Sequence, residues 1–514
     1  MTDLSPPRIW LALGILFLFR IALASLLPIT GDEAYFVLWG RFPDFGFYDH
    51  PPMVGWWMSA LLAISDAPLW LRLPSVLLPP ALAVATYFVL KHSGQERAKY
   101  AGLFVLLAPA NVWNVLITTD TPLVLFGVLS SLAFIRAFQT ERLLPYFLCA
   151  LLFAGAVLSK YFAALLGIAF AVATLLAPTR RRFAGLLLIG FLMLPALALM
   201  GWWNAENCWP NILFNLVNRN TRAGFHWQQP AMYGLMMAYM LGFLPIWFGL
   251  RRPSWLIPWK GTSEDRMYWA LSWVPLILFA LLSFSKQIGL HWVLTFVPLT
   301  LLGLLRHLSV TQAQLSIRWL ALLGLVHMLI LGVLGAIPLE RWKDNSRYPE
   351  IVWTLKTSTL VEAAGIKNES DRLWFTDGYT YSAELSYARD RTLGRLSTYG
   401  GEHVGVFGPG SHYARQDDRL TDFNALDGKN FGIVLRSAPA ETEYVHYFRH
   451  IKIEPFQVAG ATFYRVLGDG FLYATYRDKV LKPIQDRFYQ FPNWLPDCGC
   501  FFGKRYFAGE SPAG

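Results

Sequence analysis

The stretch Phe183-Ala-Gly-Leu-Leu-Leu-Ile-Gly-Phe-Leu-Met-Leu-Pro-Ala-Leu-Ala-Leu-Met-Gly-Trp202 carries no charged residue and directly follows three arginines. An α-helix needs about 20 predominantly apolar residues to cross the hydrocarbon core of a bilayer. This stretch therefore predicts a membrane-spanning helix, and ten similar runs accompany it. The runs lie at 9–28, 68–90, 100–117, 121–137, 145–159, 161–177, 183–202, 229–250, 267–284, 289–306 and 318–338.

The composition of the 514-residue chain agrees with a polytopic membrane protein. Hydrophobic residues make up 55% and charged residues only 15%, against about 45–50% and about 25% in soluble domains. A soluble protein could not cover so much apolar surface, and the same figures exclude intrinsic disorder. The first run resembles a signal peptide but lacks a small-residue cleavage site, so we expect an uncleaved helix.

The distribution of Lys and Arg between the runs predicts how the chain is oriented. Alternate connections beginning with the N-terminus hold 15 basic residues before position 340. The opposite set holds five, which are Arg41, Lys160, Arg219, Arg222 and Lys286. Because cytoplasmic loops carry the excess of basic residues, the first set is predicted to be cytoplasmic. An odd number of spans then places residues after 340 on the side of the membrane away from the cytoplasm.

The net charge of +10 follows from these cationic connections. No basic stripe is interleaved with exposed aromatic residues, so we expect no nucleic-acid partner.

Two domains are expected, a transmembrane domain over 1–340 and a small α/β domain over 341–514. The patterns predict strands at 431–436 and 461–467 and helical segments at 350–363 and 381–387. The tail 470–514 has no clear assignment. Four cysteines are too few for a disulfide framework, and the C-x-C of Cys498 and Cys500 could be a local redox pair or two incidental thiols.

The first outer connection concentrates acidic residues. It contains Gly31-Asp-Glu-Ala-Tyr35 and Tyr48-Asp-His-Pro-Pro-Met53, with Asp44 between them. Asp32 and Glu33 directly follow one apolar run, and Asp49-His50 directly precedes the next, so both pairs could converge on one site. Acids packed against the ends of membrane helices usually have a function. For Asp44, a solvated loop position is the favoured interpretation.

Three further polar insertions fall on the same predicted side. Asp120 lies in a short connection, and Lys160 lies between two apolar runs, where desolvation demands an anionic partner. Lys286 precedes His291-Trp292 and could simply extend its ammonium group to the membrane surface.

Basic side chains at membrane depth, together with acidic side chains on the outer side, indicate a reaction on a lipid-linked phosphate. The cations can neutralise a lipid-linked phosphate and stabilise it as a leaving group. A carboxylate can orient or deprotonate the acceptor that attacks the carbon bonded to that phosphate. No nucleotide-binding glycine motif is present, so the energy must arrive attached to lipid.

The two halves of the first connection resemble the first-loop signature of bacterial type C (GT-C) membrane glycosyltransferases. This group is similar to protein O-mannosyltransferases and to the lipid A aminoarabinose transferase. Ser159-Lys160-Tyr161, Trp203-Asn204 and the segment 286–292 also resemble later motifs of the group. Asp377-Gly-Tyr379 with Ser382-Ala-Glu-Leu-Ser-Tyr387 resembles a part of its outer domain.

The resemblance implies an inverting transfer from a polyprenyl-phosphate sugar to a periplasmic-side acceptor, most simply lipid A or another lipopolysaccharide glycan. It assigns catalytic roles to three acids, Asp32, Glu33 and Asp120. The donor phosphate is assigned to five basic side chains, Lys160, Lys286, Arg219, Arg222 and His291. Substrate contacts are assigned to Tyr35, Tyr48, His50, Tyr161 and Asn204. Membrane lipids are the remaining expected partners.

The resemblance also implies a divalent metal ion near the active site. Asp49 and His226 are the nearest equivalents of its ligands, although this chain has Asp-His-Pro-Pro where an acid-Lys-Pro pattern is expected. The alternative is a hydrogen-bonded His226 and an Asp49 paired with Arg222.

Three other functions compete with transfer to lipid A. A protein O-mannosyltransferase would use a protein acceptor. A transporter or flippase of lipid-linked glycans would explain membrane charges, but paired half-repeats with broken helices are not evident. A membrane-anchored binding protein would need only one span.

Overall fold

The computed structural model describes residues 6–218, 224–366, 371–396, 399–408, 416–496 and 500–508. The chain forms two compact units. The first consists of residues 1–27, 72–198 and 222–336, and the second of residues 28–71, 199–221 and 337–514. The sequence places a domain boundary near 340, where the chain passes from one unit to the other. It did not anticipate that two earlier segments join the C-terminal part.

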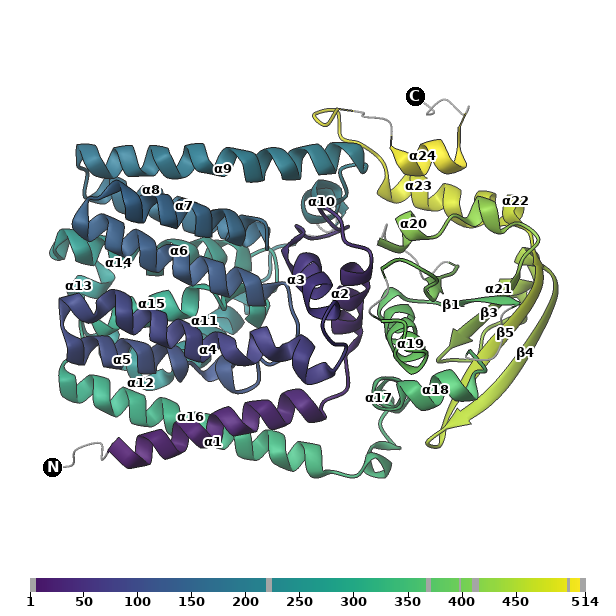
Figure 1. Ribbon diagram of the computed structural model, residues 1–514, viewed down its shortest axis with the longest axis horizontal. Coiled ribbons are helices and arrows are strands. Elements are labelled where there is room, and N and C mark those ends of the chain that lie inside the picture. The colour runs from purple at the N-terminus through teal and green to yellow at the C-terminus, as the bar shows by residue number, and fades with distance from the viewer. Residues whose placement is uncertain are drawn as a thin grey trace. The chain divides into compact units, whose positions relative to one another are not determined.

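Helices form the first unit, and the eleven apolar runs overlap twelve of the described α-helices, because the run 229–250 contains both α11 and α12 (Figure 1). The long helix α6 packs on α7, and α14 packs on both α8 and α15. The bounds of the helices that contain the runs are α1 Pro6–Leu26, α4 Pro68–Leu90, α5 Gln95–Leu106, α6 Asp120–Thr140, α7 Leu143–Val157, α8 Ala164–Leu176, α9 Arg180–Glu206, α11 Gln228–Leu241, α12 Phe243–Gly249, α14 Ser263–Ser283, α15 Phe296–Leu305 and α16 Val310–Ala336.

Five helices of the described residues are long and apolar enough to cross a membrane, or up to seven if each of two bent pairs is one span. One bent pair is α11 and α12, which meet at 101° around Gly242, whose φ is +81°. Four further apolar helices are shorter than a full span. The polytopic helical fold is confirmed, while the number of eleven spans stays a prediction.

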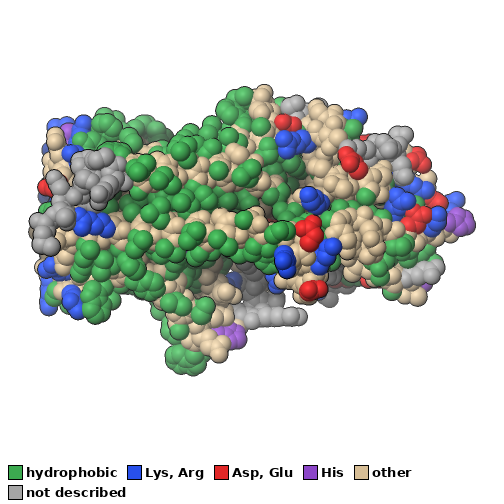
Figure 2. Space-filling model, turned by 90° about the horizontal axis from the view of Figure 1, so that it is seen from below, with side chains coloured by type: hydrophobic (Ala, Val, Ile, Leu, Met, Phe, Trp, Pro, Cys, Tyr) green, Lys and Arg blue, Asp and Glu red, His purple; other side chains and the backbone are tan. Residues whose placement is uncertain are grey.

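The surface of α16 shows why this unit suits a membrane. Leu322, Leu329 and Val333 on this helix each expose half or more of their surface. Figure 2 shows apolar side chains spread over the face where α1 and α16 lie, while Lys and Arg appear at the left end of this face and again to its right. Apolar surface of this extent is what a lipid environment accommodates.

A mixed sheet is the centre of the second unit. Its strand order is β2-β1-β3-β5-β4. Strand β1 runs parallel to β2 and β3, whereas β3 with β5 and β5 with β4 are antiparallel. The strand bounds are β1 Arg372–Thr376, β2 Gly405–Val406, β3 Asn430–Leu435, β4 Phe448–Val458 and β5 Ala461–Phe471.

The long hairpin of β4 and β5 turns at Ala459 and Gly460, which both have positive φ, as a two-residue turn of this kind requires. Strands β3 and β5 occupy the two stretches that the alternation predicts.

Three helices pack on this sheet, and one of them also contacts the first outer connection. They are α17 Tyr348–Leu355, α18 Thr357–Ala363 and α19 Tyr379–Thr392. The first outer connection, expected to be a loop, is partly helical and contains α2 Gly31–Arg41, while α3 Met53–Leu62 follows it. Helix α19 packs closely on α2, because Gly31 lacks the Cβ that would meet Thr380 at 2.6 Å.

The described residues of the unassigned tail include the short α-helices α22 Tyr473–Tyr476, α23 Lys482–Phe488 and α24 Phe501–Tyr506. Their aromatic side chains join one hydrophobic core with Tyr48 and the sheet. A disulfide links Cys208 to Cys500 across 292 residues. The expectation of a local redox pair or incidental thiols is therefore wrong for Cys500, whose partner is distant in sequence. Cys498 lies outside the described residues.

Candidate active site

A buried ion pair lies at the start of α6. The Lys160 Nζ donates hydrogen bonds of 2.8 Å to both carboxylate oxygens of Asp120. The two residues are only 7% and 2% exposed. Asp120 is the first residue of α6, and Lys160 follows α7 in extended conformation. The anionic partner that desolvation demands for Lys160 is therefore Asp120.

Hydroxyl groups extend this polar cluster toward α4. The Thr121 Oγ1 lies 2.9 Å from the Ser75 Oγ, which donates to the Leu116 carbonyl at 2.9 Å. Ser75 and Thr121 are both buried. These bonds hold the chain that precedes α6, and they fix where Asp120 presents its carboxylate.

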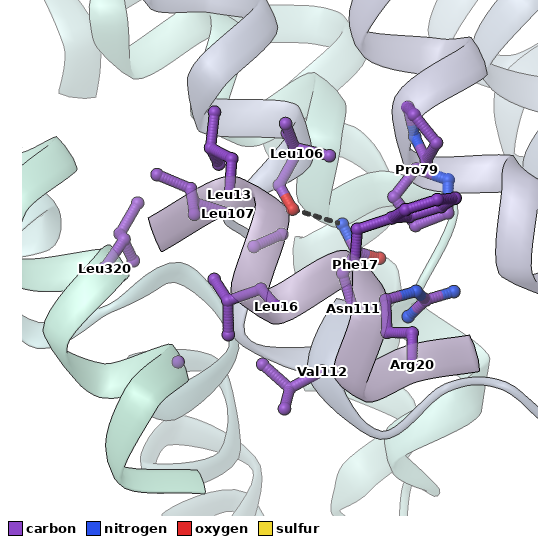
Figure 3. A pocket seen from close by; sticks show the side chains of 13 residues that line it. Leu13, Leu16, Phe17, Arg20, Pro79, Leu106, Leu107, Asn111, Val112 and Leu320 are labelled. Atoms are coloured by element: carbon purple, nitrogen blue, oxygen red, sulfur yellow. Dashed lines mark hydrogen bonds between the residues drawn. The ribbon is translucent and has the colours of Figure 1, made fainter. Parts of the chain in front are cut away.

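Arg20 of α1 adds hydrogen bonds to the backbone of α4 beside this polar cluster. Proline has no N–H group, so Pro79 and Pro80 inside α4 leave the carbonyls of Ser75 and Val76 without their helical donors. The Arg20 Nη2 donates to these two carbonyls at 2.6 and 3.4 Å. Arg20 also lines a small apolar pocket of about 40 Å³ between α1, α4 and α16 (Figure 3). Arg20 thus supplies hydrogen bonds to the two carbonyls of α4 that the prolines leave without a backbone donor.

In the second unit, Asp32 and Glu33 have different surroundings. Both lie in the first turn of α2. The Glu33 Oε2 accepts hydrogen bonds of 3.1 Å from the backbone N–H and the hydroxyl of Thr30, which forms a capping box. Glu33 is fully buried, whereas Asp32 is exposed. The geometry gives Glu33 a structural task and leaves Asp32 accessible to a substrate, while their catalytic roles stay predictions.

The rest of the first connection is fixed by the segment that follows α9. The Asn211 Nδ2 donates to the carbonyls of Phe47 and Tyr48 at 2.5 and 2.8 Å. The Asn204 Oδ1 in turn accepts a hydrogen bond from the Asn211 backbone N–H at 3.2 Å. Asn204 is 3% exposed, so in this structure it supports the loop that carries Tyr48 and His50.

Asp44 is not the solvated loop residue that we expected. Its carboxylate forms an ion pair with Arg419. It also accepts a 3.0 Å hydrogen bond from the Trp203 indole N–H. Because Arg419 lies 375 residues away in sequence, no local pattern could have indicated this pair.

The sequence analysis assigned no role to the acids of α19 and its preceding turn, although the motif it noted contains Asp377 and Glu384. Asp390 forms a buried ion pair with Arg41 of α2. Glu384 is 3% exposed and accepts a hydrogen bond of 2.9 Å from the Thr354 hydroxyl. Burial, together with the nearby charge of Asp32, raises the pKa of the Glu384 carboxyl to about 7. Burial also raises the pKa of Asp377.

The other predicted site residues are distributed as follows. In the first unit, Lys286 and Tyr161 are partly buried, and His291 and His226 are exposed. In the second unit, Tyr35 and Tyr48 are 4% and 5% exposed, and the Tyr35 ring packs edge-on against Tyr379 at 4.9 Å. Arg219 and Arg222 lie outside the described residues.

The residues proposed for a metal do not make a ligand set by themselves. Asp49 Oδ1 lies 3.2 Å from the Nδ1 of its neighbour His50, and His226 belongs to the other unit. The described part of the chain contains no group of three or more His, Cys, Asp or Glu that could hold an ion, whereas protein metal sites use three or four such ligands. The metal role of Asp49 and His226 stays a prediction, and no chemical step below depends on it.

Comparison with known proteins gives three matches. Residues 49–203 match the family model described as dolichyl-phosphate-mannose-protein mannosyltransferase. The lipid A galacturonosyltransferase RgtD of Rhizobium johnstonii is 27% identical over 270 residues, which is 50% of this chain and 55% of that protein. The crystal structure of ArnT from Cupriavidus metallidurans in the apo state matches with a TM-score of 0.59 and 14% identity, over 90% of this chain and 98% of ArnT. The chain thus aligns with about half the length of its curated relative and shares a fold with ArnT.

Proposed function

We propose that this chain is a glycosyltransferase. Its motifs and these matches identify it as a relative of the type C membrane glycosyltransferases. It moves a sugar from a polyprenyl-phosphate donor to an acceptor on the periplasmic side of the inner membrane. The acceptor is lipid A or another lipopolysaccharide glycan, and the anomeric configuration inverts.

The observation that carries this proposal is the buried pair of Lys160 and Asp120 in a unit of apolar helices. Ionised groups are costly at membrane depth and mark functional sites there. An ammonium group in such a place can hold a phosphate whose hydrocarbon chain remains in lipid.

The proposed reaction breaks the bond between the anomeric carbon and the phosphate oxygen. An acceptor hydroxyl attacks that carbon from the opposite face, so a new carbon–oxygen bond forms with inversion. Asp32, exposed at the start of α2, takes the hydroxyl proton. Lys160, Lys286 and His291 stabilise the departing polyprenyl phosphate, with Arg219 and Arg222 as further cations.

The disulfide supports the proposed side of the membrane. Disulfides form and persist in oxidising compartments such as the bacterial periplasm and are rare in the cytosol. Cys208 and Cys500 both belong to the second unit. The disulfide thus supports the proposal that this unit, with Asp32 in it, is periplasmic.

The acceptor is proposed from the name of one relative. RgtD is named for transfer to lipid A, which favours a glycolipid. The matched family model is named for a lipid-phosphate sugar and a protein acceptor, which supports the donor class and keeps protein as the alternative acceptor.

The direct test uses the purified full-length protein with radiolabelled polyprenyl-phosphate galacturonic acid or mannose, and with lipid A or protein as acceptor. We expect label in lipid A. Label only in protein would overturn the acceptor, and no transfer from either donor to either acceptor would overturn the function.

The role of Asp32 is tested by Asp32→Asn. The variant should lose at least about 100-fold in rate, the usual range for a general base, while it still binds the donor. Asp344→Asn removes an exposed carboxylate elsewhere in the second unit and should retain activity. Full turnover by Asp32→Asn would contradict the assignment.

A further inference from the structure

Within the second unit, two asparagine side chains of the segment after α9 hold the backbone of the first outer connection. The buried Asn211 donates through its Nδ2 to two successive carbonyls, those of Phe47 and Tyr48. The Asn215 Nδ2 donates to the next carbonyl, that of Asp49, at 3.3 Å. Backbone carbonyls that leave water need a hydrogen-bond partner. These two amide groups therefore help to fix the conformation of the connection just before His50.

The backbone that carries Asn211 is strained. The two residues before α10 Pro210–Ile212, Cys208 and Trp209, have φ values of +72° and +51°. This left-handed region is unfavourable for residues with a Cβ. Such a conformation persists only where the surrounding structure holds it. The place of Asn211 thus depends on whatever holds the turn at Cys208 and Trp209.

Contacts with the C-terminal tail hold this turn. Cys208 is 2% exposed and is joined by the disulfide to Cys500, which directly precedes α24. The Trp209 indole N–H donates to the Pro496 carbonyl at 2.9 Å. Cys208 also shares a hydrophobic core with Tyr48. Among these contacts, the disulfide is the one that a reductant can break.

We propose that Asn211 is a positioning residue for the segment 48–50, and that it holds this segment in place only while the disulfide constrains the turn before it. The oxidation state of Cys208 and Cys500 thereby controls how well the protein binds its substrates. This inference rests on the proposed function, because that function assigns substrate contacts to Tyr48 and His50.

The redox step needs a dithiol as reductant. One of its thiolates attacks the sulfur of Cys500, the less buried partner, and the Cys208 sulfur leaves and takes up a proton. The second thiolate then displaces Cys500, so the dithiol closes to a disulfide and both cysteines become thiols. With the cross-link broken, the turn at Cys208 can relax out of the left-handed region. Asn211 then moves away from the two carbonyls that it holds.

The first test compares Asn211→Ala with the matched control Asn207→Ala in full-length protein, with polyprenyl-phosphate sugar and lipid A as substrates. The Asn207 Nδ2 donates to the Trp203 carbonyl of the preceding helical turn at 2.7 Å. Asn211→Ala should raise KM for at least one substrate about tenfold or more, and Asn207→Ala should not. A protein that merely lost stability would contain less active enzyme, which lowers kcat and leaves KM unchanged. Unchanged KM values in Asn211→Ala, or an equal rise in Asn207→Ala, would contradict the proposal.

The second test reduces the wild-type protein with dithiothreitol, below the thermal midpoint of the reduced form, so it stands even if Asn211→Ala does not fold. KM should rise as in Asn211→Ala and should return to its first value after reoxidation. Reduction of Asn211→Ala should add less than about twofold, because two changes that act through one contact are not additive. A reduced wild type with the oxidised KM, or an equal further rise in Asn211→Ala, would overturn the proposal.

Hydrogen exchange separates this inference from the proposed function. The segment includes a turn in which the Phe47 N–H donates to the His50 carbonyl at 2.9 Å, and its amides should be protected in the oxidised protein. Reduction and Asn211→Ala should each speed their exchange about tenfold or more, whereas Asn207→Ala should not. If the oxidised protein transfers no sugar but exchange responds in this way, the proposed function fails. If it transfers sugar and neither KM nor exchange responds to reduction, this inference fails alone.

Discussion

Lys160 and Asp120 are each tolerable inside an apolar unit only because the other is present. Removing one partner of a buried ion pair leaves an uncompensated charge and costs about 3–5 kcal/mol. We therefore expect Lys160→Met to lower the thermal midpoint of the full-length protein in detergent markedly. The double variant Lys160→Met with Asp120→Leu should recover much of the loss. A single variant as stable as the double would show that the pair is not buried as described.

The carboxyl of Glu384 gives a pH prediction at the same scale. Its pKa rises from 4.5 to about 7 on folding, so the folded chain holds a proton that the unfolded chain has released at intermediate pH. Its contribution to stability is therefore complete below pH 4.5 and is lost as the pH rises toward 7, by about 3 kcal/mol at most. Glu384→Gln should flatten the decrease in midpoint between pH 5 and 8.

The control for this experiment is Glu402→Gln, because Glu402 is exposed. Its pH profile should match that of the wild type. A Glu384→Gln profile with the wild-type slope would show that Glu384 does not titrate in this range.

At the scale of the element, helix α4 shows how a sequence-local defect is compensated from another helix. Pro79 and Pro80 remove two donors, and Arg20 of α1 supplies a replacement. Arg20→Leu should therefore destabilise the protein, by about 1–3 kcal/mol for the unsatisfied carbonyls. Adding Pro79→Ala and Pro80→Ala restores the backbone donors and should recover most of the midpoint. Failure of this rescue would mean that the protein needs Arg20 for a reason other than the two carbonyls of α4.

At the scale of the whole molecule, the disulfide joins a segment after α9 to the C-terminal tail. A cross-link stabilises by restricting the unfolded chain, typically by about 2–4 kcal/mol. Cys208→Ser and treatment with reductant should lower the thermal midpoint by similar amounts, and their effects should not add. Non-reducing peptide mapping of protein from intact cells should recover the Cys208 and Cys500 peptides joined. The control variant Cys149→Ala should leave that joined peptide unchanged, because Cys149 is a free thiol. Absence of the joined peptide in the wild-type protein would contradict the pairing.

The sequence by itself determined the helical membrane class and the approximate position of most apolar helices, because the length and hydrophobicity of a run are local properties. It did not predict that α5 ends at Leu106 or that the run 229–250 breaks into two helices. It also showed that Lys160 requires an anion, since the cost of burying a charge does not depend on the fold. The capping box of Thr30 and Glu33 could also be read from the sequence, but Glu33 was considered only for a catalytic role.

Tertiary structure alone decided which distant groups meet. Asp120 became the partner of Lys160, Arg419 the partner of Asp44, and Cys500 the partner of Cys208. Pairing energies depend on distance in space, and one chain of given composition can bring many different pairs together, so only packing selects among them.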